Sequence, residues 1–124
     1  MTSKILLIED NAVLREMTVR HLQRFGYECE IAVDGEQGLE RLPSISPDVI
    51  LLDITLPGKD GRAVAEEIKS NPKTHAIPII AITAQAMVGD RERVIASGCD
   101  DYMSKPIDFE TLHQKIQALL QSAD

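Results

Sequence analysis

Aromatic residues are scarce in this sequence, which has two Phe, two Tyr and no Trp among 124 residues. Hydrophobic residues still make up 44% of the chain, as in ordinary globular proteins. The core must therefore be aliphatic, which favours helices stacked on a parallel sheet over an all-β sandwich. The length fits one domain, residues 1–124, and leaves no room for two.

Long apolar segments and a secretion signal are also lacking. No apolar stretch approaches the roughly 20 residues of a membrane-spanning helix, and Met1–Lys4 leads directly into a short apolar run. Only two cysteines occur, Cys29 and Cys99, without metal-binding spacing, so we expect two reduced thiols. These absences predict a cytoplasmic protein with no membrane insertion.

Basic clusters are missing as well. The formal net charge is −7, from 20 acidic and 13 basic residues, and no run of Lys and Arg appears. Such a chain repels nucleic acid and anionic lipid, so we expect no direct nucleic-acid binding, although a partner protein could bind DNA. The acidity suits a site that gathers a cation.

Short apolar runs alternate with longer amphipathic segments along the whole chain. This pattern is typical of an α/β fold in which helices cover both faces of a parallel sheet. Five strand-then-helix units are too few for an eightfold barrel and predict an open, doubly wound sheet. The predicted strands are 5–8, 28–33, 49–52, 77–82 and 101–104, and the predicted helices are 11–25, 34–42, 60–70, 87–97 and 108–121.

Local signals set the predicted helix ends. Gly26 and Gly98 follow the first and fourth helices, as is common after a helix C-terminus. Pro43 is expected to stop the second helix, and Asn71-Pro72 the third. Asp108 is the predicted N-cap of the last helix.

Polar side chains stand at the ends of four predicted strands. They are Glu9 and Asp10 after the first, Asp53 after the third, Thr83 at the fourth and Lys105 at the fifth. In an open parallel sheet, ligands bind outside the carboxyl ends of the strands, so we expect these side chains to share one pocket.

The chemistry of this set points to a hard cation and phosphoryl transfer. Two carboxylates at ~4 Å repel by about 4 kcal/mol at an effective dielectric near 20, so three need a counter-charge. Oxygen ligands without His or Cys favour Mg2+ over zinc. Mg2+ beside a carboxylate and a lysine suits phosphoryl transfer, and an aspartate can be the nucleophile. Asp53, on the predicted central strand, is the candidate, while Glu9 and Asp10 can hold the metal as a pair.

Five motifs at fixed separations identify a known family. The sequence resembles the receiver domain of bacterial two-component response regulators over essentially its whole length. The motifs are Ile5–Asn11, Asp48–Asp53, Leu56–Gly61, Ile82–Ala84 and Tyr102–Pro106. The resemblance implies a flavodoxin-like (βα)5 domain with a five-stranded parallel sheet in the order 2-1-3-4-5.

The resemblance also implies a role for each matching position. Asp53 corresponds to the phosphorylated aspartate. Asp10 corresponds to a direct Mg2+ ligand, Glu9 to a ligand acting through water, and the backbone carbonyl of Thr55 to a further ligand. Glu9 stands where Asp is frequent, which removes no required group.

The remaining implied roles concern the response to phosphorylation. Thr83 corresponds to the hydroxyl that moves toward the phosphoryl oxygen, and Tyr102 to the aromatic that turns inward with it. Lys105 would bridge to the phosphate, and the Lys105–Pro106 bond corresponds to one that is cis in the family. Leu56 replaces a frequent Met, while Thr55 and Gln85 are expected to tune hydrolysis of the acyl phosphate.

The implied function is that of a phosphoacceptor switch. Asp53 would accept a phosphoryl group from a histidine kinase or a histidine phosphotransfer protein, and the altered surface would be read by an effector protein. The chain would be a monomer or a weak phosphorylation-dependent dimer. Its only catalysis would be its own phosphorylation and slow hydrolysis of the acyl phosphate, so it is not classed as an enzyme.

Four other interpretations remain open. The chain could be a constitutive interaction module that ignores phosphorylation, or a receiver fragment of a hybrid histidine kinase. A haloacid-dehalogenase-like phosphatase would need a second aspartate at position 55, where Thr55 stands, and a cap domain. Flavin binding is disfavoured by the acidic loop after the first strand.

His21, His75 and His113 share no acidic partner pattern and are expected to be solvated surface residues.

Overall fold

The five strands form one parallel sheet. The computed structural model describes residues 3–54, 61–84 and 90–122. The strands are β1 (Lys4–Ile8), β2 (Glu28–Ala32), β3 (Val49–Asp53), β4 (Ile79–Thr83) and β5 (Asp101–Ser104). Their order is β2-β1-β3-β4-β5, with every neighbouring pair parallel. The predicted doubly wound sheet and the implied order 2-1-3-4-5 are confirmed.

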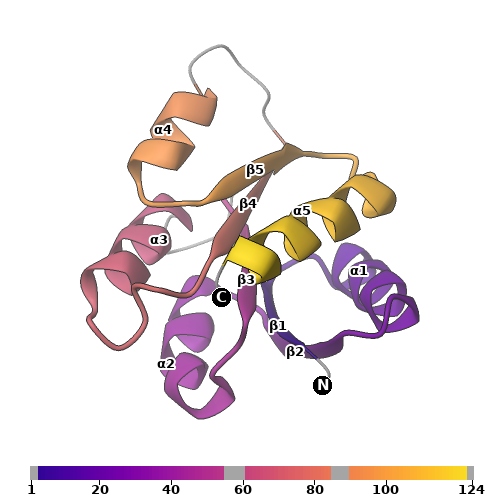
Figure 1. Cartoon of the computed structure of the whole chain (residues 1–124), viewed down its shortest axis with the longest axis horizontal. Coiled ribbons are helices and arrows are strands. Elements are labelled where there is room, and N and C mark those ends of the chain that lie inside the picture. Colours follow the sequence, from indigo (N-terminus) through magenta and orange to yellow (C-terminus); the bar gives the residue numbers. More distant parts are fainter. Residues whose placement is uncertain (1–2, 55–60, 85–89, 123–124) are drawn as a thin grey trace.

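Helices cover both faces of this sheet. They are α1 (Ala12–Arg24), α2 (Gly35–Ile45), α3 (Gly61–Ser70), α4 (Asp90–Ala96) and α5 (Phe109–Ser122). Figure 1 shows α1 and α5 on one side of the sheet and α2, α3 and α4 on the other. The chain thus adopts the flavodoxin-like (βα)5 fold.

The inner strands β1, β3 and β4 are almost continuously apolar because they bury both of their faces. Side chains alternate along a strand, so Ile5 and Leu7 pack toward Leu22 of α1, whereas Leu6 and Ile8 pack toward the opposite helices. All five residues of β3 and of β4 are buried. The two clusters on either side of the sheet are predominantly aliphatic, as the scarcity of aromatic residues predicted.

Side-chain caps begin the helices where the sequence indicated. Asn11 accepts a hydrogen bond from the Leu14 N–H at 3.0 Å, and Asp34 accepts one from the Gln37 N–H at 2.8 Å. The predicted N-cap Asp108 accepts from the N–H groups at positions 110 and 111.

No helix among residues 3–54, 61–84 and 90–122 is long and apolar enough to cross a membrane.

The second helix does not stop at Pro43, so that prediction was wrong. α2 continues to Ile45 and ends at Ser46, whose backbone is left-handed with φ 49°. Proline removes a single backbone donor here, in the last turn, and the Ser46 N–H still donates to the Leu42 carbonyl at 3.0 Å. Burial of Leu42 and Ile45 against the sheet favours the extra turn. The predicted helix starts at positions 60 and 87 lie outside the described residues.

Two of the three histidines are not simple surface residues, which corrects a second prediction. His21 stacks on Phe109 with ring centroids 3.9 Å apart, and His113 stacks on Phe25 at 4.0 Å. The His113 Nδ1 also lies 2.9 Å from the Tyr27 hydroxyl. Both histidines are half-buried between α1 and α5, whereas His75 is exposed as predicted. The sequence pattern did not show that α1 and α5 would be neighbours.

Candidate functional site

Three carboxylates meet at the carboxyl ends of β1 and β3. Asp53 is the last residue of β3, and Glu9 and Asp10 directly follow β1, its neighbour in the sheet. One carboxylate oxygen from each residue lies within 4.8 Å of the others. Glu9 and Asp53 are each 2% exposed, whereas Asp10 is exposed. The predicted convergence of these three residues is therefore observed.

Lys105, which directly follows the edge strand β5, also reaches this cluster. Its Nζ lies 3.1 Å from Asp53 Oδ2 and 3.4 Å from Glu9 Oε1. The backbone positions it, because its N–H donates to the Thr83 carbonyl at 2.8 Å. The Lys105–Pro106 peptide bond is cis. One ammonium thus faces two buried carboxylates at once.

The ionisation of Glu9 reflects this crowding. Burial, together with a hydrogen bond to Asp53 and the charge of Asp53, raises the pKa of Glu9 from 4.5 to about 7. The Asn11 N–H and the charge of Lys105 oppose that shift. Burial alone would lower the pKa of Lys105, but its contacts with Asp53 and Glu9 outweigh burial and raise it. A single lysine does not neutralise the cluster, so the site favours an additional positive charge.

The donor set fits Mg2+. The grouped ligand atoms are all carboxylate oxygens, and a partly exposed edge at Asp10 leaves room for the waters that Mg2+ retains. Within residues 3–54, 61–84 and 90–122, no His or Cys side chain belongs to a cluster that could hold a metal ion. Glu9, Asp10 and Asp53 are the described residues that would hold the ion. Thr55, the implied carbonyl ligand, and Gln85 lie outside the described residues.

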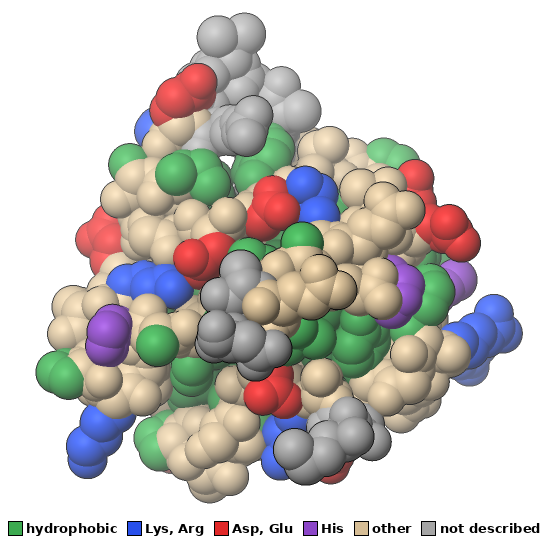
Figure 2. Space-filling view, in the orientation of Figure 1, with side chains coloured by type: hydrophobic (Ala, Val, Ile, Leu, Met, Phe, Trp, Pro, Cys, Tyr) green, Lys and Arg blue, Asp and Glu red, His purple; other side chains and the backbone are tan. Residues whose placement is uncertain are grey.

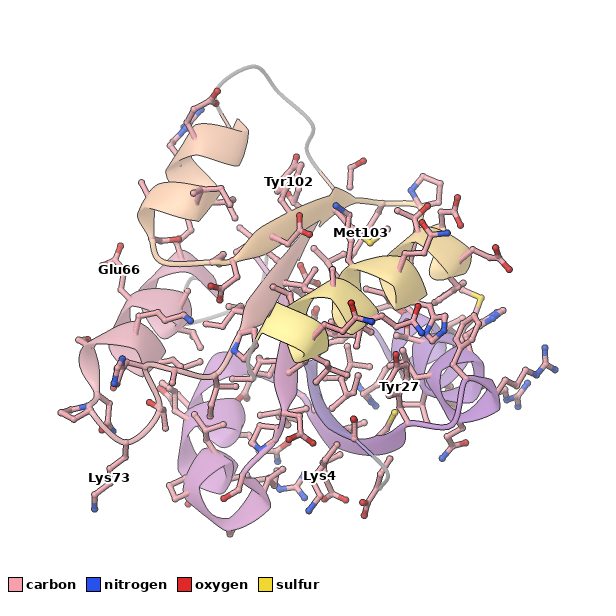
Figure 3. The ribbon with its side chains drawn as sticks, viewed as in Figure 1. Lys4, Tyr27, Glu66, Lys73, Tyr102 and Met103 are labelled. Carbon is pink, nitrogen blue, oxygen red and sulfur yellow. The ribbon has the colours of Figure 1, made fainter. Side chains whose placement is uncertain are left out.

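Thr83 and Tyr102 lie on the strands beyond Asp53. Thr83 is the last residue of β4, is 3% exposed, and follows Ile82, which pairs with Asp53. Tyr102 is half-buried on β5. Figure 3 shows its side chain projecting away from α5, whereas that of Met103 lies between β5 and α5. The structure brings Thr83 to the same edge of the sheet as Asp53 and places Tyr102 one strand further out.

Gly61 allows α3 to begin against the end of β3. A Cβ atom at this position would lie 2.6 Å from the Asp53 carbonyl oxygen and 2.6 Å from the Ile54 Cα. The Gly61 N–H donates to the Ile54 carbonyl at 3.2 Å. Gly61 therefore shapes the backbone that carries Asp53 and contributes no chemistry of its own.

Sequence reasoning missed Arg15. Its Nη1 donates to the backbone carbonyls of Glu9 at 3.0 Å and Asp10 at 3.4 Å. An arginine one turn into a helix after two acids is a weak signal, because such a side chain usually extends into solvent.

The surface outside the site carries both signs of charge. On the face shown in Figure 2, the Lys and Arg side chains form separate groups among acidic ones rather than a continuous patch. This distribution gives no electrostatic footprint for a nucleic acid on the visible described surface.

The fold and the site together define a class of protein. It is a doubly wound α/β domain whose acidic site lies at the carboxyl ends of its strands and is bridged by a lysine. The family model described as the response regulator receiver domain matches residues 5–117. This chain belongs to the response regulator receiver domain family, a family of two-component signalling modules rather than of enzymes.

Relatives place this domain in more than one setting. The chain is 34% identical to the DNA-binding dual master transcriptional regulator RpaA of Synechocystis sp., over 98% of this chain and 50% of that protein. It is 35% identical to the polar-differentiation response regulator DivK of Brucella ovis, over 99% of this chain and 100% of that protein. The chain therefore spans about half the length of the first curated relatives it matches and the whole of DivK.

A solved structure bears on the metal. The receiver domain of a sensor histidine kinase from Pseudomonas aeruginosa matches with a TM-score of 0.90 and 34% identity, covering 98% of this chain and 99% of that one. That structure has a magnesium ion coordinated in its active-site cleft.

Proposed function

We propose that this chain is a phosphoacceptor response regulator in which Asp53 receives a phosphoryl group with the help of Mg2+. The observation that carries the proposal is the position of Asp53 Oδ2, 3.1 Å from the Lys105 ammonium and grouped with the carboxylates of Glu9 and Asp10. A buried aspartate so surrounded has both a cationic partner and the ligands for a divalent ion.

The chain's own residues divide the work of the transfer. An Asp53 carboxylate oxygen forms a bond to phosphorus while the bond from phosphorus to the donor, a phosphohistidine nitrogen, breaks. Lys105 neutralises charge on the incoming phosphoryl oxygens, and Glu9, Asp10 and Asp53 would hold the cation. When bound, Mg2+ supplies further charge neutralisation on those oxygens.

The output is a change in the surface built from α4, β5 and α5. Phosphorylation replaces one negative charge by about two and adds strong acceptor oxygens. Thr83 and Lys105 would contact the new group, and Tyr102 would repack beside Thr83. This would bias a two-state equilibrium, and a complete switch requires about 5 kcal/mol of differential stabilisation.

The partners follow from this chemistry. A histidine kinase or a histidine phosphotransfer protein would supply the phosphoryl group, and an effector protein would read the product. RpaA, DivK and the kinase receiver domain illustrate three settings for such a module: a DNA-binding regulator, a stand-alone regulator and part of a kinase.

The test is phosphorylation by a small donor. The protein is incubated with acetyl phosphate and Mg2+ and its intact mass is measured, beside Asp53→Asn and a sample with a chelator. We expect one added phosphoryl group on the wild type with Mg2+ and none in the other two samples. No mass gain in the wild type, or an equal gain in Asp53→Asn, would reject the proposal.

A further inference from the structure

Arg15 makes a contact that the proposed function does not use. It lies in the first turns of α1, is half-buried, and extends back to the loop between β1 and α1. Its Nη1 donates to the Glu9 carbonyl at 3.0 Å and to the Asp10 carbonyl at 3.4 Å. In the described part of the chain, no other donor to these two carbonyls is seen.

Two backbone N–H groups also hold the segment that carries the two acids in the described part of the chain. The Glu9 N–H donates to the Ala32 carbonyl at 3.0 Å, which ties the segment to β2. The Asn11 N–H donates to Glu9 Oε2 at 3.1 Å. Arg15 therefore fixes the carbonyl side of the two peptide units from which the Glu9 and Asp10 side chains project.

We propose that Arg15 is a positioning residue for the cation site, holding the backbone of Glu9 and Asp10 so that their carboxylates converge with that of Asp53. The inference rests on the proposed function, since it assigns Arg15 a part in the same site. Interactions of this kind, one step removed from the metal, commonly change metal affinity by about 10- to 100-fold.

The charge of Arg15 and its hydrogen bonds should change the Mg2+ affinity in opposite directions, so the proposal can be tested. A guanidinium near the acids repels a divalent cation, so loss of its charge alone would strengthen Mg2+ binding. Loss of its hydrogen bonds frees the Glu9 and Asp10 backbone and weakens binding. The sign of the change in Mg2+ affinity therefore separates the two effects.

The experiment compares three variants with the wild type by calorimetric Mg2+ titration. Arg15→Met keeps the aliphatic stem and removes the donors, and Arg15→Lys keeps the charge and one donor group. Arg20→Ala is the matched control, because Arg20 is exposed on the same helix and, within the described part of the chain, makes no hydrogen bond or ion pair with Glu9 or Asp10. Amide hydrogen exchange at Glu9 and Asn11, measured without metal, provides a second readout.

We expect about tenfold weaker Mg2+ binding and faster metal-free exchange at these amides in Arg15→Met. Arg15→Lys should recover only part of the lost Mg2+ affinity, because its ammonium still donates hydrogen bonds but lacks the planar fork of the guanidinium. Arg20→Ala should bind Mg2+ as tightly as the wild type or slightly more tightly.

Four results would overturn the inference. A positioning role is excluded if Arg15→Met binds Mg2+ as well as the wild type or better. It is also excluded if the Glu9 and Asn11 amides of this variant exchange no faster than those of the wild type. If Arg15→Met does not fold, Arg15→Lys with wild-type affinity excludes it equally. A wild type that binds no Mg2+ rejects the proposed function as well, whereas a wild type that binds Mg2+ and accepts phosphoryl confines the failure to Arg15.

Discussion

The raised pKa of Glu9 predicts an unusual pH dependence of stability in the metal-free protein. A carboxyl group whose pKa is 4.5 when unfolded and about 7 when folded favours folding while it is protonated. Its contribution is complete below pH 4.5 and is lost as the pH rises through 7. The shift corresponds to about 3 kcal/mol, because one pKa unit is worth about 1.4 kcal/mol.

The perturbation that isolates this effect is Glu9→Gln. Glutamine is nearly isosteric, cannot ionise, and can donate a hydrogen bond to Asp53 as the protonated acid does. In a chelator, the free energy of unfolding of the wild type should fall by about 3 kcal/mol relative to that of Glu9→Gln between about pH 5 and about pH 8. Denaturant unfolding followed by circular dichroism at several pH values measures both curves.

Mg2+ should reduce this difference. A cation held by Glu9 and Asp10 keeps Glu9 ionised in the folded protein, so the wild type regains stability mainly above pH 7. Glu28→Gln, at an exposed position of β2, is the control and should leave the wild-type pH profile unchanged. Parallel curves for the wild type and Glu9→Gln in the chelator would refute the reasoning.

Two further predictions concern the backbone of the site and the thiols. Gly61→Ala should lose about 2 kcal/mol and accept phosphoryl more slowly, because its Cβ would meet backbone atoms at the end of β3 at 2.6 Å. Gly26→Ala is the control, because Gly26 has φ +93° and open space around it. It should lose about 1 kcal/mol in thermal unfolding and accept phosphoryl as the wild type does. A Gly61→Ala variant no less stable than this control would contradict the predicted clash with β3. Burial raises the pKa of the Cys29 and Cys99 thiols to about 11, so at about pH 8 a disulfide reagent should label the folded protein far more slowly than the unfolded one. Equal labelling rates in the two states would show that the thiols are not protected.

Most of the site was within reach of the sequence because it is assembled from strand ends. Glu9 and Asp53 each directly follow a short apolar run, and Lys105 directly follows the short predicted strand 101–104. Parallel strands carry their carboxyl ends to the same edge of the sheet. Their convergence therefore needs only the sheet topology. The length of the Lys105 side chain then brings its ammonium to 3.1 Å from Asp53.

The features that the sequence did not reveal depend on contacts between elements. Pro43 was expected to end a helix, but burial of Leu42 and Ile45 against the sheet outweighs the loss of one backbone donor near the helix end. His21 and His113 were expected in solvent, but His21 stacks on Phe109 of α5 and His113 stacks on Phe25, which directly follows α1. Local propensity could not reveal either outcome, because each depends on which helix packs beside which.

The sequence by itself determined the class of fold, the acidic edge and the phosphoacceptor hypothesis, since alternating apolar periodicity and residues at strand ends are local properties. Tertiary structure decided how the edge is electrostatically balanced. It buried Glu9 beside Asp53, which raises the pKa of Glu9, and turned Arg15 back onto the backbone of the acid pair. These effects depend on distances of a few ångströms between groups and on their removal from water, and no linear pattern of residues records either.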